Sequence, residues 1–387
     1  MRTITAFWDM GNGNGTGSKN HEDCANHRDS GLLAPSIRAP VPFGPVHHSP
    51  VSIPVMRIGL IYDTFDAYPW REDDPPDADA EYEPEKTVEV LEETVRHMGH
   101  TPVRVGTAFD LQEQLADGLA LDAAINIAEG AHSRNREAYA PILLEMAGIP
   151  CLGSDALTLS VTLDKAWTKN LVAAAGVPTP PHRVFGGAGA VDSDDLPPFP
   201  LFVKPRYEGT SKGITPESKV ETVDALRDEV DRVTTTYEQD ALVEGFVAGG
   251  GEFTVAVVGH DPPEALPVLQ RAVESSTGIG LHALEHRGAP AADRDWAHDL
   301  AGTLDTDLED ELQAHARTVF DTLDCRDFAR ADFRVDAEGR PWFLEINPLP
   351  TFKPDDTFAI AAEILGRDYI DYLAEVFEQG LRRLGLS

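Results

Sequence analysis

The sequence predicts an α/β protein whose first part is a parallel sheet covered by helices. From residue 56 onward, strand-like and helix-like segments alternate, which is the order of βαβ units. The helix-like segments end at glycines such as Gly99 and Gly148, as helices commonly do. Beyond Pro178 the pattern changes to shorter strands, and the length of 387 residues suits two or three domains.

Each expected element has its own local signal. Segment 86–100 has the apolar spacing of an amphipathic helix, and Ser154 and Asp155 can cap one long helix over 156–176. Segment 71–84 is acidic, rich in proline and without an apolar period, so it predicts a loop. In total we expect strands at 56–63, 101–106, 121–129, 200–205, 241–247 and 252–259, helices at 86–100, 136–149, 156–176 and 311–323, and a hairpin at 328–348.

The chain is strongly acidic. It has 32 Lys and Arg against 66 Asp and Glu, a formal net charge of −34. Such a field repels phosphate backbones and anionic headgroups, so we expect neither a nucleic acid nor a membrane surface as partner. A content of 42% hydrophobic residues still predicts a globular fold. Many acids and only 8 lysines are typical of a halophile's cytoplasmic protein, in which salt screens the repulsion.

The N-terminus and the cysteines bear on the compartment. The sequence has no apolar run of about 18 residues and no basic segment followed by an apolar one, so we expect no membrane span and no secretory signal. Cys24, Cys151 and Cys325 are widely spaced and form no C-x-x-C pair. A cytoplasmic protein is therefore the expectation.

Residues 1–55 differ from the rest of the chain. They are rich in Gly, Asn, Ser and Pro and carry no net charge, so 56–387 holds all of the −34. This composition predicts a disordered extension. Met56 directly precedes the first expected strand, and we expect it to be the natural start of the protein.

The hairpin at 328–348 is the most informative segment, because side chains alternate between the two faces of a strand. The pairs expected from its turn are Val335–Trp342, Asp332–Glu345 and Arg330–Asn347. Two facing carboxylates repel each other unless a cation lies between them, and with the oxygen of Asn347 they suit magnesium. Magnesium in turn usually comes with the phosphates of a nucleotide. The alternative is a solvated strand face with weak charge pairs.

Lysines are rare enough to be informative, because only seven lie outside the extension. Lys204 ends an expected strand, and the following loop at 208–213 contains Gly, Ser, Thr and Lys212. Such a loop can bind polyphosphate through backbone N–H groups and hydroxyls, while an ammonium neutralises the charge. Lys165 lies on the expected long helix. The alternative is that these lysines are ordinary surface residues.

Two glutamates flank a glycine-rich turn within 243–255. Glu244 ends one expected strand and Glu252 begins the next. Carboxylates on both sides of a strand edge can accept hydrogen bonds from the donor edge of adenine and from the two hydroxyls of a ribose. A glycine-rich β-turn without a ligand is the alternative, and the segment alone favours it.

Taken together and in this order, five segments resemble the ATP-grasp superfamily, and more closely the D-alanine–D-alanine ligases. The segments are TLDKAWTKNLVAAAGVPTP (162–180), FVKPRYEGTSKGI (202–214), LVEGFVAGGGEFTVAV (242–257), RADFRVDAEG (330–339) and FLEINPLP (343–350). The resemblance implies a three-domain ATP-grasp architecture with ATP held between the last two domains. These are an N-terminal doubly wound α/β domain at 56–153 and two α+β ATP-grasp subdomains at 154–246 and 247–387.

The resemblance also implies roles for individual residues. Those implied to be catalytic are Arg330, Lys204 and Ser211. Those implied to ligate magnesium, or manganese in its place, are Asp332, Glu345 and Asn347. Those implied to bind ATP are Lys165 and Lys204 at the phosphates, Thr210 and Ser211 in the closing loop, Glu244 and Val247 at the adenine, and Glu252 at the ribose.

The implied activity is an ATP- and magnesium-dependent ligation of two D-alanine molecules through an acyl phosphate. ATP and small amino acids are the implied partners, and a homodimer is left open. The recognition residues, however, depart from the family pattern. The glutamate that holds the first amine has no clear match, although Glu81, Glu83 or Glu85 could replace it. Asp356 stands where a serine would bind the substrate carboxylate, and it would repel that group unless Lys353 compensates.

Two other functions stay open. The first is an ATP-grasp ligase for a different carboxylate–amine pair, which the recognition departures and the halophile-like composition favour. The second is a nucleotide-binding regulatory protein without catalysis. The presence of Arg330 together with Asp332 and Glu345 argues against it, since binding alone does not require this set.

Overall fold

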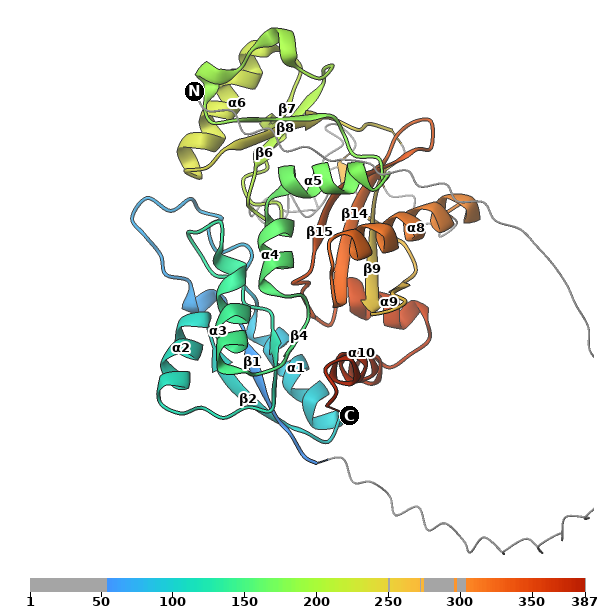
Figure 1. Cartoon of the computed structure of the whole chain (residues 1–387). Coiled ribbons are helices and arrows are strands. Elements are labelled where there is room, and N and C mark those ends of the chain that lie inside the picture. Colours follow the sequence, from blue (N-terminus) through green and yellow to red (C-terminus); the bar gives the residue numbers. More distant parts are fainter. Residues whose placement is uncertain (1–53, 250, 272, 275–295, 298–303, 387) are drawn as a thin grey trace, which may run out of the picture. The chain divides into compact units, whose positions relative to one another are not determined.

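Three main sheets organise the part of the chain that the structure describes (Figure 1). The structure is a computed structural model and describes residues 54–249, 251–271, 273–274, 296–297 and 304–386. Residues 53–387 form one compact unit. The predicted extension at 1–55 lies outside the described residues, apart from its last two.

The first sheet is parallel, as predicted. Its strands follow the order β2-β1-β3-β4, and each strand runs parallel to its neighbours. Gly99 and Gly148 follow two of its helices with φ of 82° and 70°, a left-handed backbone that glycine adopts without strain. Its elements are β1 (Arg57–Ile61), α1 (Glu85–His97), β2 (Thr101–Gly106), α2 (Ala108–Ala116), β3 (Ala123–Asn126), α3 (Tyr139–Ala147) and β4 (Cys151–Leu152), with 3₁₀ turns at Phe65–Ala67 and Arg136–Ala138.

The second sheet is antiparallel, with the strand order β5-β8-β6-β7. Leu226, Val230 and Val233 of helix α6 are buried against it. Two strands, β5 and β7, and helix α6 were not among the predicted elements. The elements are β5 (His182–Phe185), β6 (Leu201–Pro205), β7 (Lys219–Val220), α6 (Val223–Thr236) and β8 (Ala241–Gly245), with 3₁₀ turns at Ala188–Ala190, Ser193–Asp195 and Pro216–Ser218.

The third sheet contains the predicted hairpin. Its strand order is β10-β9-β14-β15, and β11 also pairs with β9. Helix α8 packs on it through Leu312, Ala316 and Phe320, in one core with Phe333 and Phe343. The elements are β9 (Gly251–Gly259), β10 (Glu264–Ala265), β11 (Leu269–Arg271), α8 (Thr306–Thr322), β14 (Asp327–Val335) and β15 (Pro341–Asn347), beside a separate strand pair of β12 (Val273–Glu274) and β13 (Trp296–Ala297).

The last two helices join the first sheet to the third. They are α9 (Thr357–Ile364) and α10 (Tyr369–Arg383). One hydrophobic core combines Ile58 of the first sheet, Phe328 of the third and Phe377 of α10. Arg383 of α10 also binds Asp327 at the start of β14, with nitrogen–oxygen distances of 2.7 Å. None of the helices in the described ranges is long and apolar enough to cross a membrane.

The predicted single helix over 156–176 is wrong, because the chain breaks at Asp164. The two helices are α4 (Ala156–Leu163) and α5 (Lys165–Ala174). Asp164 has an extended backbone, and its carboxylate accepts the N–H of Trp167 at the start of α5. Both oxygens of that carboxylate also accept from Arg206, at 2.7 and 2.8 Å. The break places Lys165 in the first turn of α5.

The hairpin register is partly as predicted. Arg330 pairs with Asn347 and Asp332 pairs with Glu345, as expected. The expected pairing of Val335 with Trp342 is wrong. Val335 pairs with Pro341, because the register shifts by one residue beyond Asp332 and leaves Leu344 as the extra residue of a bulge. The two functional pairs therefore keep the predicted register, and Leu344 joins Glu345 in lining a cavity.

Candidate active site

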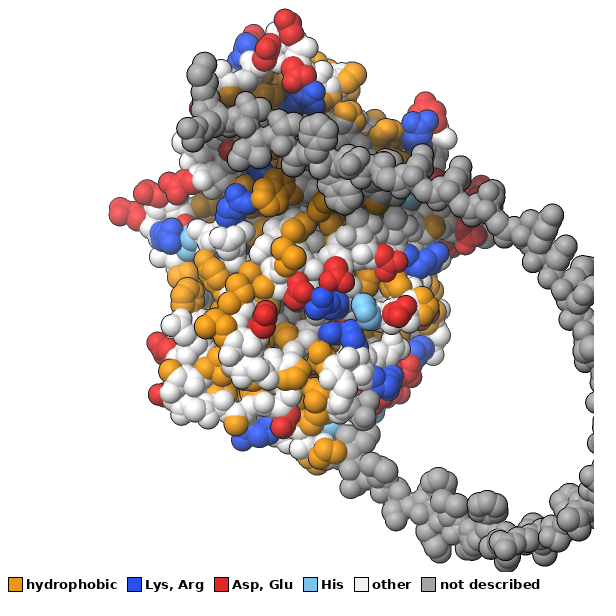
Figure 2. Space-filling model, in the orientation of Figure 1, with side chains coloured by type: hydrophobic (Ala, Val, Ile, Leu, Met, Phe, Trp, Pro, Cys, Tyr) orange, Lys and Arg blue, Asp and Glu red, His pale blue; other side chains and the backbone are white. Residues whose placement is uncertain are grey.

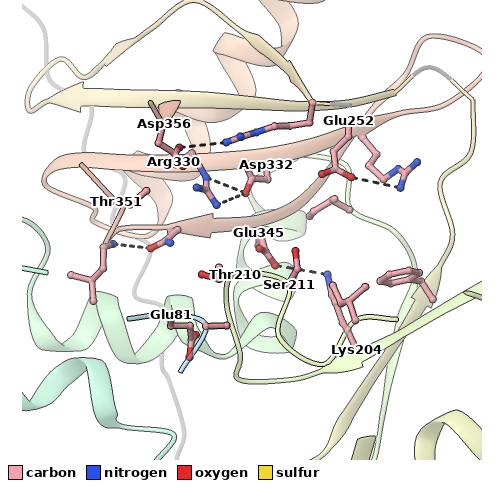
Figure 3. Close-up of a pocket in the computed structure, with 18 of the residues that line it drawn as sticks. Glu81, Lys204, Thr210, Ser211, Glu252, Arg330, Asp332, Glu345, Thr351 and Asp356 are labelled. Carbon is pink, nitrogen blue, oxygen red and sulfur yellow. Dashed lines mark hydrogen bonds and ion pairs between the residues drawn. The ribbon is translucent and has the colours of Figure 1, made fainter. Parts of the chain in front are cut away.

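A cavity of about 170 Å³ brings nearly all of the predicted site residues together (Figure 3). Its walls come from strands β6 and β8, the loop at 208–213, the third sheet and the loop that precedes α1. The predicted residues that line it are Lys204, Thr210, Ser211, Glu244, Val247, Glu252, Arg330, Asp332, Glu345 and Asn347. Lys165 lines a smaller adjoining chamber, which it shares with Glu345 and Asn347.

Asp332 and Glu345 lie opposite each other on the two strands of the hairpin and are surrounded by cations. Asp332 accepts hydrogen bonds from Arg330 at 3.1 and 3.3 Å and from the hydroxyl of Thr254. Glu345 lies 3.4 Å from the Nζ of Lys165 and 3.9 Å from that of Lys204. Burial alone would raise the pKa of Glu345, but the surrounding cations, Lys165 and Lys204 foremost, outweigh it and the pKa is lowered.

The oxygen donors on the hairpin side of the cavity fit a magnesium ion that also binds phosphates. Asp332, Glu345 and Asn347 supply two carboxylates and one amide oxygen from one face of the hairpin. The described residues contain no group of three or more His, Cys, Asp or Glu side chains placed to hold a metal ion. Magnesium is commonly held by one or two carboxylates, with phosphates and water completing its shell, so this small donor set is sufficient.

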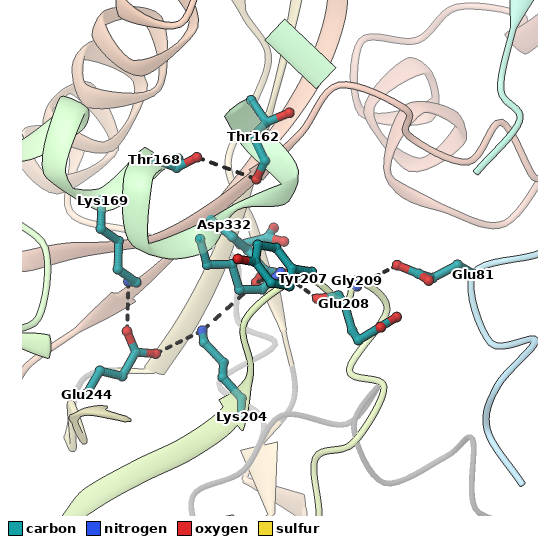
Figure 4. A network of polar contacts seen from close by, with 12 residues as sticks. Glu81, Thr162, Thr168, Lys169, Lys204, Tyr207, Glu208, Gly209, Glu244 and Asp332 are labelled. Carbon is teal, nitrogen blue, oxygen red and sulfur yellow. Dashed lines mark hydrogen bonds and ion pairs between the residues drawn. The ribbon is translucent and has the colours of Figure 1, made fainter. Parts of the chain in front are cut away.

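Glu244 lies between two buried lysines (Figure 4). One carboxylate oxygen is 2.8 Å from the Nζ of Lys204 and the other is 2.8 Å from that of Lys169. Burial would raise the pKa of Glu244, but the two cations lower it to about 2. Lys169 is fully buried and also donates to the hydroxyl of Thr179 and the carbonyl of Phe343. Glu244 therefore holds both lysines in place.

The predicted phosphate loop at 208–213 is held at both ends by the acidic loop at 71–84. The N–H of Gly209 donates to Glu81 at 2.6 Å, and the N–H of Gly213 donates to Asp77 at 2.9 Å. Between them, Thr210 and Ser211 have φ of 46° and 58°, an unusual left-handed conformation for residues other than glycine. Both of these residues line the main cavity.

Of the three glutamates considered for the first amine, two lie at the cavity. Glu81 accepts from Arg136 at 2.8 and 2.9 Å, and Glu83 accepts from the hydroxyls of Thr87 and Thr351 at 2.7 and 2.9 Å. Burial raises the pKa of Glu83. Glu85 does not line the cavity and pairs with Arg104 on the exposed side of α1.

The end of the cavity near Arg330 contains both signs of charge. Asp356 caps helix α9 and lies 3.7 Å from Arg271, which sequence reasoning did not single out. Burial would raise the pKa of Asp356, but Arg330 and Arg271 lower it to about 2. The expected repulsion of a substrate carboxylate by Asp356 is therefore offset by arginines, and Lys353 lines the same end.

Several buried charges at the cavity could not be predicted as site residues, Lys169 first among them. The signal for Lys169 was present, because it is one of the rare lysines and lies one helical turn after Lys165. Glu129 ends the expected strand at 121–129 and Glu137 begins the expected helix at 136–149, next to Arg136, which binds Glu81. No local pattern reveals that this segment faces the active site.

Residues 171–378 match the family model described as the D-ala D-ala ligase C-terminus, which is more than half of the chain. The chain belongs to the D-alanine–D-alanine ligase family. The family resemblance expected from the motifs is thereby confirmed. The matched segment contains every residue predicted to be catalytic, to bind ATP or to ligate magnesium, except Lys165.

Relatives of this D-alanine–D-alanine ligase family member cover most of its described part. A D-alanine–D-alanine ligase of Burkholderia ambifaria is 32% identical over 258 residues, which are 65% of this chain and 77% of the relative. That of Pelotomaculum thermopropionicum is 27% identical over 311 residues, 78% of this chain and 93% of the relative. An uncharacterised protein of Sinorhizobium fredii is 33% identical over 259 residues, which are 67% of this chain and 74% of the relative.

Solved structures confirm the ATP-grasp fold class for this family member. The VanG D-Ala:D-Ser ligase of Enterococcus faecalis superposes with a TM-score of 0.65 at 18% identity, covering 84% of this chain and all of that one. The D-alanine–D-alanine ligase of Bacillus anthracis complexed with ATP superposes with a TM-score of 0.63 at 21% identity, covering 85% and 98%.

Proposed function

We propose that the protein is an ATP- and magnesium-dependent ligase that joins a carboxylate to an amine through an acyl phosphate, most closely a D-alanine–D-alanine ligase. The observation that carries this proposal is the pairing of Asp332 with Glu345 beside Arg330, within reach of Lys165 and Lys204. Membership of the family and relatives named D-alanine–D-alanine ligase support it. The similar structure complexed with ATP supports the nucleotide.

Lys165 and Lys204 would bind the phosphates of ATP. Their ammonium groups flank Glu345, and the dense negative charge of a triphosphate would be neutralised there. Thr210 and Ser211 would close the phosphate site with their hydroxyls and backbone N–H groups. Asp332, Glu345 and Asn347 would hold magnesium, which when bound neutralises the charge of the phosphates.

The other end of the nucleotide would lie among apolar side chains. Phe202, Phe246 and Val247 line this end of the cavity, where a base can be buried. Glu252 would accept from the ribose hydroxyls. We assign Glu244 to the adenine end of the cavity, as the family resemblance implies. Because its two oxygens face Lys169 and Lys204, Glu244 would also hold Lys204 in place.

The reaction would proceed in two steps. A carboxylate oxygen of the first amino acid attacks the γ-phosphorus of ATP and forms an acyl phosphate while ADP leaves. The neutral amine of the second amino acid then attacks the acyl carbon, and inorganic phosphate leaves as the peptide bond forms. Arg330 would stabilise the negative charge that develops on the transferring phosphoryl group, and Ser211 and Lys204 would orient that group.

A second candidate is a ligase for another carboxylate–amine pair. It is favoured by the recognition end of the cavity, where Asp356 faces Arg271 and Arg330, and where Glu81 and Glu83 come from the acidic loop. Phosphate release from ATP tests both candidates, with D-alanine compared against a panel of amino acids. Release with D-alanine supports the first candidate, and release with another acid supports the second. No release with any amino acid would contradict both and leave only nucleotide binding.

We further propose the finer assignments that the sequence suggested. They are the domains at 56–153, 154–246 and 247–387, a cytoplasmic location, a high-salt environment and a homodimer.

Exposed hydrophobic side chains support the homodimer. On α3 and α4, the exposed fractions are 43% for Ile142, 81% for Met146 and 73% for Leu157. Hydrophobic side chains gather on this face (Figure 2). Light scattering of the purified chain tests the homodimer.

A further inference from the structure

Lys169 is a buried cation that lies behind the cavity wall. Its side chain is fully buried and lines neither the main cavity nor the adjoining chamber, so it cannot contact a substrate itself. From α5 its Nζ reaches Glu244 on β8 at 2.8 Å (Figure 4). It also donates to the carbonyl of Phe343 on β15 at 3.3 Å and to the hydroxyl of Thr179 at 3.1 Å. Lys169 is therefore held where the second and third sheets meet.

Keeping this charge in the interior is costly. Burial, which Glu244 only partly offsets, lowers the pKa of Lys169 to about 8. Buried ion pairs often add little to stability, because taking two charges out of water costs about as much as their attraction returns. A purely structural link between α5, β8 and β15 would need no charge. The charge of Lys169 is better explained by its effect on Glu244.

The charge balance around Glu244 shows what Lys169 adds. Glu244 carries one negative charge and lies 2.8 Å from both Lys169 and Lys204. With Lys204 alone it would form a neutral buried pair, and little positive charge would be left for a phosphate. With both lysines, the group of three keeps a net charge of one positive unit. Lys204 is the one of the two lysines that lines the main cavity, so the surplus charge lies where the phosphates of ATP would bind.

We propose that Lys169 is a positioning residue for the phosphate site, because it balances the charge of Glu244 and so leaves the charge of Lys204 available to ATP. This assignment rests on the proposed ligase function. When Lys204 turns toward a phosphate, Lys169 remains as the partner of Glu244. Without it, the same movement would leave Glu244 as an uncompensated charge in the interior, which is strongly unfavourable.

Binding of tripolyphosphate tests the proposal. This probe has no base, so the assigned role of Glu244 at the adenine does not enter. Calorimetry of the full chain with magnesium at pH 7 gives the affinity. Lys169→Met keeps the length of the side chain without its charge and should weaken binding about tenfold to a hundredfold, the effect of losing one charged contact. Lys86→Met, at a 60% exposed site on α1, is the control and should bind as wild type.

The double variant Lys169→Met/Glu244→Gln should restore the affinity to within about threefold of wild type. It removes one charge of each sign, so the net charge is again one positive unit, and the amide keeps an oxygen for Lys204. A purely structural Lys169 predicts the opposite, namely that the double variant binds no better than Lys169→Met. That result, or wild-type affinity in Lys169→Met, would overturn the proposal. If the wild type itself binds no tripolyphosphate, the proposed phosphate site fails too, which separates the two failures.

A pH titration decides the question even if Lys169→Met does not fold. Between pH 7 and 9, wild type should lose about fivefold to tenfold in affinity relative to the double variant, because Lys169 loses its proton. The ionisation of tripolyphosphate affects both proteins equally. An equal pH dependence of wild type and double variant would contradict the proposal.

The charged groups around Lys169 do not obscure this titration. The pKa values of three of them are lowered and that of Lys204 is raised, away from the range between pH 7 and 9, and Lys165 is present in both proteins. These groups are Lys165 on α5, His182 on β5, Lys204 on β6, Glu244 on β8 and Glu345 on β15.

Discussion

At the scale of single residues, the site is built from buried charges that depend on one another. Glu244 is shared by Lys169 and Lys204, and Glu345 lies near Lys204 as well. Each of these charges would be expensive alone in a protein interior, and removing one leaves its partner uncompensated. Substitutions here must therefore be read with stability and activity measured together.

Glu345→Gln separates the proposed metal role from folding. The amide keeps the size of the side chain but loses the charge that would bind magnesium, so we expect kcat for phosphate release to fall at least about a hundredfold. The Tm should change by only a few degrees, because Glu345 is partly exposed. Glu338→Gln, in the exposed turn of the same hairpin, is the matched control. A fully active Glu345→Gln would contradict the assignment.

Glu137 gives the protein a predictable pH dependence. Its pKa is raised from 4.5 to about 7 in the folded state. Because the folded protein binds this proton more tightly than the unfolded chain does, the free energy of unfolding falls as the pH rises from about 4.5 through 7. The charges that act on it are those of Arg136, Lys165, Glu81, Glu129 and Glu208.

Glu137→Gln removes this ionisation. At pH 8 the variant should therefore be more stable than wild type by about 1–3 kcal/mol, and at pH 4 the difference should nearly vanish. Urea unfolding at both pH values measures it. A variant that is less stable than wild type at pH 8 would show that Glu137 is already compensated in the free protein.

The sequence allowed prediction of residues whose partners are local, and not of those whose partners are distant. Asp332 and Glu345 followed from the two-residue period of a short hairpin. One of the two partners of Glu83 is Thr351, 268 positions away, and no periodicity connects them. Glu129 and Glu137 were missed for the same reason, because only the assembled fold shows that they lie at the cavity.

At the scale of elements, the loop at 71–84 has a larger role than its composition indicated. The sequence predicted an acidic loop, and in the structure Asp77 and Glu81 hold the two ends of the phosphate loop by its backbone N–H groups. This acidic loop thereby fixes the left-handed backbone of Thr210 and Ser211. Its carboxylates are positioning groups for the loop that would close over ATP.

Glu81→Gln should loosen the phosphate loop. The amide loses the ion pair with Arg136 and weakens the bond to Gly209, so we expect the KM for ATP to rise about tenfold and kcat to change less. Trypsin should also cut faster after Lys212 in the absence of nucleotide. Glu72→Gln, at an exposed site in the same loop, is the control. Unchanged cleavage by trypsin together with an unchanged KM for ATP would contradict the role of Glu81 in holding the phosphate loop.

Helix boundaries were the least predictable of the elements. The run at 156–176 has the spacing and composition of one helix, and its local signals contain nothing that ends it at Asp164. The break is stabilised by Arg206, 42 positions away, which binds the carboxylate of Asp164. The strands β5 and β7 were missed because short strands carry little periodicity.

At the scale of the whole molecule, the net charge of −34 sets the conditions in which the fold is stable. Like charges on a compact chain repel one another, and the repulsion is screened over about 10 Å at 0.1 M salt and about 3 Å at 1 M. The Tm should therefore rise when KCl is increased from about 0.2 to 3 M. Calorimetry measures this, with sorbitol as an uncharged control. A Tm that stays flat or falls would contradict the halophilic assignment.

The order of elements and the fold class could be predicted, but the way in which the sheets meet could not. The alternation of strands and helices identified the parallel sheet, and the motifs identified the family. In the sequence, nothing distinguishes three phenylalanines in separate parts of the chain from ordinary apolar residues, namely Phe328, Phe352 and Phe377. Only the structure shows that they form one core together with Ile58.

That shared core has a consequence for synthesis in the cell. The first sheet is made early, yet one of its faces is completed by α10, which contains nearly the last residues of the chain. While the ribosome is still translating, this face has no covering helix and remains open to chaperones. The N-terminal sheet therefore finishes folding only after α10 has left the ribosome. A short C-terminal truncation would then harm the beginning of the protein as much as its end.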